Sequence, residues 1–161
     1  MTWNILLPQG NESLKCRWDI VPYTRGRGLD VGCAGTKLFA HFIGVDNLRD
    51  VKLFDAQMDP DIVCDALEMP FFASESLDFV FSSHTLEHIE DHVKALTEWW
   101  RVIKQDRHLV LYLPHADFYP RKGQHGANED HKHDFLPQDI IEAMKSFSWD
   151  LVVKEERDGG D

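Results

Sequence analysis

The chain has no apolar run approaching the length of a membrane span, and its first residues lack the basic start of a secretory signal. Its three cysteines, Cys16, Cys33 and Cys64, lack the paired spacing of a metal site, which favours reduced thiols in a cytoplasmic protein. Basic residues number only 17 against 28 acidic ones. The net charge of -11 argues against nucleic acid as a partner, because phosphate binding needs a basic surface. A small molecule, a neutral glycan or a cationic cofactor fits this charge better.

The rest of the composition is that of an ordinary globular protein, with 43% hydrophobic and 28% charged residues among 161. We expect a single domain over residues 1–161 with one substantial core. Short segments rich in Val, Ile, Leu and Phe are more apolar than alternating, as buried parallel strands should be. The expected strands of this kind cover residues 28–32, 42–46, 61–65 and 77–82.

Apolar residues at three- and four-residue spacing from Leu86 to Ile103 predict one long amphipathic helix. Strands alternating with helices then predict an α/β fold with a doubly wound, mostly parallel sheet. Residues 115–136, called the lid below, are predicted to form a long loop, and loops of that length tend to be functional. The remaining expected elements are a short helix over 11–21, a strand at 108–113, a helix from Pro137 to about Phe147 and a last strand at 149–154.

A sheet of this kind usually closes with an antiparallel hairpin, and only the first strand of that hairpin is visible in the sequence. The C-terminal hairpin is therefore expected to be incomplete. Either the domain belongs to a longer chain, or a homodimer partner or further domain covers the open edge, since an uncovered edge strand invites association.

A glycine-bearing turn follows the first expected strand. Gly32 and Gly35 lie in this turn, and the next strand ends in Asp46. Glycines let the backbone approach a ligand, and an acid at the end of the second strand can hydrogen-bond a ribose diol. This arrangement predicts a site for a nucleoside-like cofactor.

Four motifs in order carry a resemblance to one family. They are Leu-Asp-Val-Gly-Cys at 29–33, Gly-Val-Asp at 44–46, Val-Cys-Asp-Ala with Leu-Glu-Met-Pro-Phe at 63–71, and Leu-Asp-Phe-Val at 77–80 running into Ser-His-Thr-Leu-Glu-His at 83–88. The chain resembles the class I S-adenosylmethionine-dependent methyltransferases, particularly small ones of glycan and cell-envelope pathways. The resemblance covers roughly residues 25–115 and is weaker in the lid. It implies methyl transfer from S-adenosylmethionine to a small-molecule or sugar/glycan acceptor, expected at oxygen.

The resemblance also implies roles for individual residues. Gly32 and Gly35 would lie beside the methionine part of the cofactor, and Asp30 would reach its amino group. Asp46 would accept from both ribose hydroxyls, and Asp65 from the adenine amino group. Ala66 would offer a backbone amide to the adenine ring and Leu67 would pack on its face. The complete expected cofactor-binding set is Asp30, Gly32, Cys33, Gly35, Asp46, Asn47, Asp65, Ala66, Leu67 and Ser83.

The sequence also departs from the family pattern. Ala34 and Thr36 stand where two of three glycines are expected, and only 16 positions separate Asp30 from Asp46. At ~1.5 Å per residue, that leaves room for about one turn of helix between the first two strands. A non-catalytic module that binds S-adenosylmethionine therefore stays open as an alternative. An NAD-dependent oxidoreductase is a weaker one, because no G-x-G-x-x-G opens a full helix.

The chain has nine histidines, of which His84, His88 and His92 are spaced by four. On one helix they would share a stripe, and such pairs can bind a metal. No H-E-x-x-H motif is present, so we expect no metal site, with His88 and His92 on an exposed flank. Glu87 is expected to be a solvated or capping carboxylate near the start of the helix.

Three histidines are candidate catalytic residues. His84 follows the fourth strand, where such folds place groups that face the acceptor, and it could take a proton from an attacking hydroxyl. A histidine bonded to backbone at a helix start is the equal alternative. His131 and His133, in a lid segment that resembles the acceptor pocket of the family, are the second choice for a base or a substrate clamp.

Overall fold

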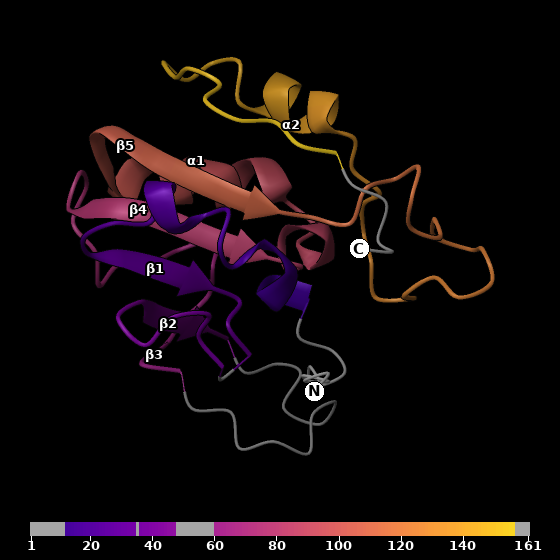
Figure 1. Ribbon diagram of the computed structural model, residues 1–161, viewed down its shortest axis with the longest axis horizontal. Helices are drawn as coiled ribbons and strands as arrows, with labels where there is room; N and C mark the ends of the chain where they lie inside the picture. The colour runs from indigo at the N-terminus through magenta and orange to yellow at the C-terminus, as the bar shows by residue number, and fades with distance from the viewer. Residues whose placement is uncertain (1–11, 35, 48–59, 157–161) are drawn as a thin grey trace, which may run out of the picture.

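The computed structural model describes residues 12–34, 36–47 and 60–156. Within them, one parallel sheet has the strand order β3-β2-β1-β4-β5 (Figure 1). This confirms the expected doubly wound fold. The strands are β1 (Gly28–Val31), β2 (Ile43–Asp46), β3 (Ile62–Val63), β4 (Leu77–Ser83) and β5 (Ile103–Tyr112).

The order of the strands places a topological switch point between β1 and β4. From β1 the chain proceeds outward to β2 and β3, then crosses to β4 on the other side of β1 and on to β5. In open α/β sheets, ligands bind outside the carboxyl ends of the strands at such a point. β1 is buried throughout and β4 almost throughout, which explains why both are nearly continuous apolar runs.

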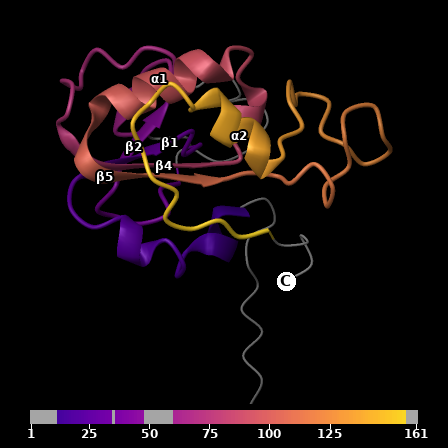
Figure 2. The same ribbon diagram turned by 90° about the horizontal axis from the view of Figure 1, so that it is seen from above.

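Helices cover both faces of the sheet, as Figure 2 shows. One face carries α1 (His92–Val102) and α2 (Pro137–Ala143), and the other carries the short 3-10 helices η1 (Glu12–Cys16) and η2 (Val21–Tyr23). Each face has its own apolar core. Buried residues on the α1 side include Leu29, Val31, Val45, Leu96, Trp99 and Val102. Buried residues on the opposite side include Ile20, Leu38, Phe42, Phe79 and Phe81.

The long helix expected from Leu86 to Ile103 is wrong. A 3-10 turn, η3 (Leu86–His88), is followed by extended backbone at Ile89, and α1 begins only at His92. The Asp91 side chain accepts a hydrogen bond from the Lys94 amide (3.0 Å), so a capped helix start interrupts the apolar spacing. Ile103 belongs to β5, which therefore starts earlier than the expected residue 108.

The expected strand at 149–154 is also wrong, since residues 149–156 have no regular secondary structure. Leu151, Val152 and Val153 are exposed there. Apolar residues form a strand only where a partner strand pairs with them, and the described residues provide none at this segment. The helix that begins at Pro137 ends at Ala143 rather than near Phe147, and η1 with the turn after it replaces the helix expected over 11–21.

Other expectations of the fold are confirmed. The lid is irregular, with one isolated bridge between His115 and Phe135. The described residues between β1 and β2 form no helix, in agreement with their short spacing. β5 is the last strand of the described sheet, and its outer edge has no partner strand there. No helix in the described ranges has the length and apolar character needed to cross a membrane.

Candidate functional site: the cofactor end and the lid

Gly32 brings the carboxyl ends of β1, β2 and β4 together. Its backbone is left-handed (φ +77°), and a Cβ atom there would lie 2.0 Å from Oγ1 of Thr85, which follows β4. Its amide donates to the carbonyl of Val45 in β2 (2.8 Å). Because no side chain fits this position, only glycine allows so close an approach at the switch point.

Asp46 ends β2 and holds the glycine turn. Its Oδ2 atom accepts a hydrogen bond from the Ala34 amide (2.9 Å), and Ala34 itself is left-handed (φ 47°). Cys33 is buried beneath the turn, while Asn47 is exposed just after Asp46. Gly35 lies outside the described residues. The expected second-strand acid is therefore half-buried at the carboxyl edge of the sheet, next to the expected glycine turn.

Asp30 lies within β1 and is buried, with 4% of its surface exposed. Its Oδ2 atom accepts a hydrogen bond from the Leu38 amide (2.8 Å). Burial raises the pKa of Asp30 to about 6, against the lowering effect of the Leu38 hydrogen bond and the Lys37 charge. In the structure this carboxylate binds the segment that follows the glycine turn.

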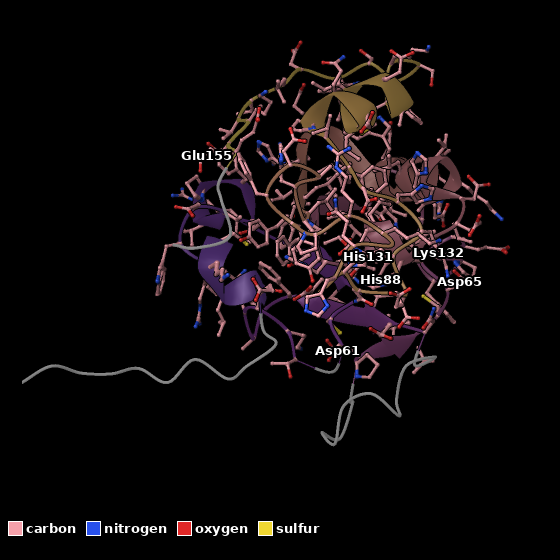
Figure 3. The ribbon with its side chains drawn as sticks, turned by 90° about the vertical axis from the view of Figure 1, so that its right-hand side faces the viewer. Asp61, Asp65, His88, His131, Lys132 and Glu155 are labelled. Atoms are coloured by element: carbon pink, nitrogen blue, oxygen red, sulfur yellow. The ribbon has the colours of Figure 1, made fainter. Side chains whose placement is uncertain are left out.

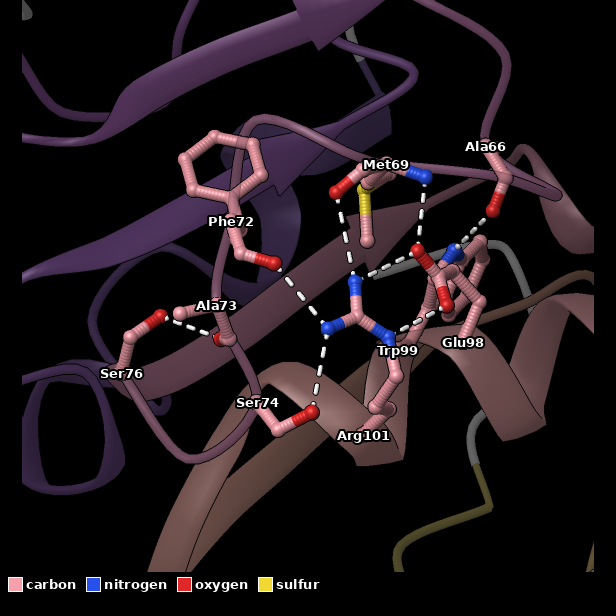
Figure 4. Close-up of polar contacts among 9 residues, drawn as sticks. All are labelled: Ala66, Met69, Phe72, Ala73, Ser74, Ser76, Glu98, Trp99 and Arg101. Carbon is pink, nitrogen blue, oxygen red and sulfur yellow. Dashed lines mark hydrogen bonds and ion pairs between the residues drawn. The ribbon is translucent and has the colours of Figure 1, made fainter.

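Asp65 organises the turn after β3. Its Oδ1 atom accepts from the Leu67 amide (2.9 Å), and the Ala66 carbonyl accepts from the Trp99 indole in α1 (2.9 Å). The Met69 amide donates to Glu98 Oε1 (2.6 Å), as Figure 4 shows. The turn carrying Asp65, Ala66 and Leu67 is thus fixed onto α1 near the β2 and β3 ends.

Arg101, also in α1, completes this anchor (Figure 4). Its guanidinium binds both carboxylate oxygens of Glu98 (2.7 and 2.8 Å) and the carbonyls of Met69 (3.3 Å) and Phe72 (3.0 Å). A planar fork of donors suits this bidentate pairing. The turn on the cofactor side is therefore rigidly tied to the helix that covers the sheet.

These residues fit the expected cofactor. Three features surround the switch point: the glycine turn that packs against Thr85, the carboxylates at the ends of β2 and β3, and the buried hydroxyl of Ser83. The Ser83 Oγ atom has no hydrogen-bond partner among the residues that the structure describes, although buried hydroxyls normally have one. The acidic character of this edge also suits a cationic sulfonium.

Comparison with known families identifies the chain. The family described as "Methyltransferase domain" matches residues 29–111, which include β2 to β4 and most of β1 and β5. The chain belongs to the class I S-adenosylmethionine-dependent methyltransferases. Its cofactor is S-adenosylmethionine, and the residues around Gly32, Asp46 and Asp65 fit that molecule. No curated protein matches the chain.

Solved structures agree on the fold. A S-adenosylmethionine-dependent methyltransferase from Archaeoglobus fulgidus is 24% identical, with a TM-score of 0.64 over 85% of this chain and 68% of its own. A Thermotoga maritima protein described as a possible histamine N-methyltransferase is 20% identical (TM-score 0.65; 84% and 68% covered). A Haloferax volcanii protein in complex with the Trm112 methyltransferase activator is 18% identical (TM-score 0.59; 84% and 66% covered).

His84 immediately follows β4 of the methyltransferase, with left-handed backbone (φ 50°), an uncommon conformation for a residue other than glycine. Its ring packs against Tyr112 at the end of β5 (centroids 5.5 Å apart). It lines a groove that also includes Lys15 of η1 and the edge of β5. Burial lowers the pKa of His84 to about 4, so the ring is neutral at neutral pH.

Glu87 is not the solvated carboxylate expected from the sequence. It is fully buried, and neither carboxylate oxygen has a hydrogen-bond partner on another described residue. Burial raises its pKa to about 7. Its Oε1 atom lies 3.6 Å from His84 Nδ1 and 3.9 Å from the Nε2 atoms of His88 and His131. The order His-x-x-Glu-His at 84–88, known from some zinc sites, was the signal that could have singled out Glu87.

The lid histidines divide into two contacts with the segment after β4. His131 is buried and packs edge-on against His88 (4.8 Å between centroids). His133 places Nε2 at 3.1 and 3.0 Å from the carbonyls of Ile89 and Glu90. His84, His88 and His92 therefore do not share one helical stripe, because the backbone between them is irregular until α1 begins.

Proposed function

We propose that this methyltransferase acts on a hydroxyl oxygen of a small-molecule or sugar/glycan acceptor, with His84 as the general base. The observation that carries this proposal is the place of His84, directly after β4 and beside the Gly32 turn through its neighbour Thr85. Residues at this position of an open α/β sheet face the crevice where ligands bind. A hydroxyl acceptor, unlike an already nucleophilic amine, needs a group that removes its proton.

The environment of His84 supports this role. Burial lowers the pKa of His84 to about 4, which keeps the ring neutral and one ring nitrogen able to accept a proton, although a pKa nearer to neutrality would make it a stronger base. Glu87 Oε1 lies 3.6 Å from Nδ1, next to the position of the imidazolium that forms. His84 also lies at the surface of a groove, whereas Glu87 is fully buried.

The two lid histidines are better placed to position the base than to act as one. His131 is buried with Nε2 facing Glu87, and it stacks on Tyr119 (5.5 Å). His133 Nε2 faces two carbonyl acceptors, so it carries a proton and donates it to the backbone after η3. Both therefore hold the lid against the segment that carries His84.

We propose cofactor contacts for the residues at the carboxyl ends of the strands. Asp46 binds the ribose hydroxyls, Asp65 and Ala66 face the adenine with Leu67 packed on it, and the Gly32 turn lies beside the methionine part. Ser83, whose buried hydroxyl lacks a described partner, supplies a further polar contact. Bound S-adenosylmethionine supplies an electrophilic methyl group on a cationic sulfur. The chain contributes alignment, which in well-placed reactants is worth ~7–11 kcal/mol.

The net charge and the cysteines bear on the acceptor class and the cellular location of the enzyme. A net charge of -11 suits a neutral glycan or small molecule rather than a nucleic acid. Cys16, Cys33 and Cys64 form no disulfide with one another, which fits the reducing cytoplasm. We also propose one domain whose open β5 edge is covered by a homodimer partner or a further domain.

Calorimetry with S-adenosylmethionine tests the site through Asp46→Ala and His84→Ala. Loss of a charge-assisted, bidentate contact should weaken cofactor binding about 100-fold in Asp46→Ala. His84→Ala should keep the affinity within about threefold and lower turnover by about 100-fold or more, because its part is proton transfer.

Two controls separate binding from folding. Asp46→Asn keeps an oxygen that can accept from the Ala34 amide but loses the charge, and it should still bind the cofactor more weakly. Asp150→Ala removes an exposed carboxylate and should change nothing. Unchanged affinity in Asp46→Ala would overturn the cofactor assignment, and unchanged turnover in His84→Ala would overturn the base.

A further inference from the structure

Three side chains from two distant segments converge beneath the lid. Glu87 and His88 belong to η3, and His131 belongs to the lid; Figure 3 shows the two histidines beside one another. Each residue offers one ligand atom, and these atoms lie within 4.8 Å of one another. Two imidazoles and a carboxylate form a ligand set typical of zinc and other first-row transition metals.

Glu87 is buried and lacks a hydrogen-bond partner on any other residue that the structure describes, as expected of a carboxylate that binds a metal ion. Its side chain is fully buried, and neither oxygen has a hydrogen-bond partner on another described residue. A buried, ionised carboxylate without a partner costs several kcal/mol, so such groups in proteins are protonated, paired or bound to a metal. No arginine or lysine contact with Glu87 is found in the described part of the chain.

The spacing of the atoms suits coordination better than hydrogen bonding. Nε2 of His88 and Nε2 of His131 each lie 3.9 Å from Glu87 Oε1, beyond the 2.7–3.2 Å typical of an N–H···O hydrogen bond. Ligands that are each about 2.0–2.1 Å from a tetrahedral ion lie about 3.3 Å from one another. The two distances to Glu87 would have to shorten by about 0.6 Å, and the widest separation within the cluster, up to 4.8 Å, by about 1.5 Å, to reach this geometry.

Backbone contacts already hold the two segments in register. The carbonyl of Glu87 accepts from the amides of Lys132 (2.7 Å) and His133 (3.2 Å), the two residues that follow His131. Tyr119 stacks on the His131 ring, with the ring centroids 5.5 Å apart. The ligands are thus fixed before any ion binds, which lowers the cost of forming a site.

We propose that Glu87, His88 and His131 bind one divalent transition-metal ion, with Zn²⁺ the best match to two imidazoles and a carboxylate. Three protein ligands leave a coordination position for water or an oxygen of the acceptor, as in catalytic rather than structural zinc sites. His84 lies beside this cluster, at 3.6 Å from Glu87. Metal binding here does not depend on which acceptor atom is methylated.

The test is calorimetric titration of Zn²⁺ into chelator-treated, tag-free protein, with metal content measured after dialysis. We expect one equivalent, a micromolar or tighter Kd, and a higher melting temperature with the ion bound. Glu87→Gln and His131→Ala should each weaken Zn²⁺ binding at least about 100-fold, because each removes a direct ligand. Absence of Zn²⁺ binding by the unchanged protein would overturn the proposal.

Two comparisons guard against misfolding and nonspecific binding. Glu87→Gln replaces a buried carboxylate by a neutral group of the same shape, so its metal-free melting temperature should equal or exceed that of the unchanged protein. His125→Ala removes an exposed lid histidine outside the cluster and should keep full Zn²⁺ affinity. Equal losses in His125→Ala and His131→Ala, or less than a tenfold loss in Glu87→Gln, would also overturn the site.

Discussion

The cofactor side of the site, at the ends of β1, β2 and β3, satisfies its carboxylates with backbone amides, whereas the lid side leaves one carboxylate without such a partner. The donors are backbone amides: that of Leu38 to the Asp30 carboxylate, that of Ala34 to Asp46 and that of Leu67 to Asp65. Glu87 is buried as deeply as any residue of the core, and within the described residues only histidines lie at ion-pair distance from its oxygens. The first arrangement is complete within the chain, and the second gains stability from a bound cation.

The difference reflects how each side is assembled. On the cofactor side, each carboxylate accepts from an amide no more than 12 residues away in sequence: 2 for Asp65, 8 for Asp30 and 12 for Asp46. On the lid side, Glu87 meets His131 only because a long loop folds back over η3. Local turns are specified by neighbouring residues, while the lid site depends on a contact between distant segments.

The largest effect that can test this division is expected from Arg101→Ala. The variant loses the bidentate pair with Glu98 and two bonds to carbonyls of the turn after β3, so we expect a loss of about 3 kcal/mol in unfolding free energy. Urea unfolding measures it. Arg107→Ala, which loses only an exposed ion pair with Asp78 (3.3 Å), should cost about 0.5 kcal/mol or less.

The Arg101→Ala variant also tests whether the cofactor side and the lid side of the site are independent of one another. Cofactor affinity should fall, because the turn with Asp65 keeps only its bonds to Trp99 and Glu98 of α1. Zn²⁺ affinity should stay unchanged, because none of its proposed ligands touches this anchor. A parallel loss of Zn²⁺ affinity would mean that the two sides form one cooperative unit.

Much of the cofactor side could be predicted from the sequence. Buried parallel strands are apolar runs, so β1, β2, β3 and β4 were located within a few residues of their observed bounds. Glycine and carboxylate positions follow directly from those strand ends. The internal bonding of the carboxylates, such as that of Asp30 to Leu38, and the anchor of the turn after β3 to Arg101 required coordinates.

The lid side could not be predicted to the same degree. The spacing of Leu86, Ile89 and Val93 is equally compatible with an unbroken helix, so the extended residue at Ile89 was missed. Without that break, Glu87 is placed on the exposed flank of a helix start. The last expected strand failed for a related reason, since 149–154 has strand composition but no partner strand in the described residues.

A smaller effect is expected from Asp30→Asn. In the folded protein the pKa of Asp30 is about 6, against 3.8 for the ordinary carboxyl, so the folded state binds more protons between these values. Stability contributed by the neutral form is therefore present below about pH 4 and lost as the pH rises through about 6. The variant stays neutral at every pH. Its unfolding free energy should therefore be about 1–2 kcal/mol higher than that of the unchanged protein at pH 8 and equal to it near pH 4.

Unfolding in urea at both pH values measures this difference, with Asp150→Asn as an exposed control that should not change it. The result bears on the comparison of the two sides. A difference that is the same at pH 4 and pH 8 would show that the Leu38 amide fully offsets the burial of Asp30, and that this carboxylate carries no electrostatic cost.

The smallest effect is expected from Ala34→Gly in the glycine turn. Ala34 has left-handed backbone (φ 47°), which costs a residue with a Cβ atom about 1–2 kcal/mol, while glycine loses about 0.5–1 kcal/mol more in chain entropy. A net gain of about 0.5 kcal/mol in unfolding free energy should follow, with unchanged cofactor affinity. Ala73→Gly, at an exposed alanine without left-handed backbone, should lose stability instead. If both variants lose stability, the Ala34 side chain makes packing contacts that matter more than its backbone strain.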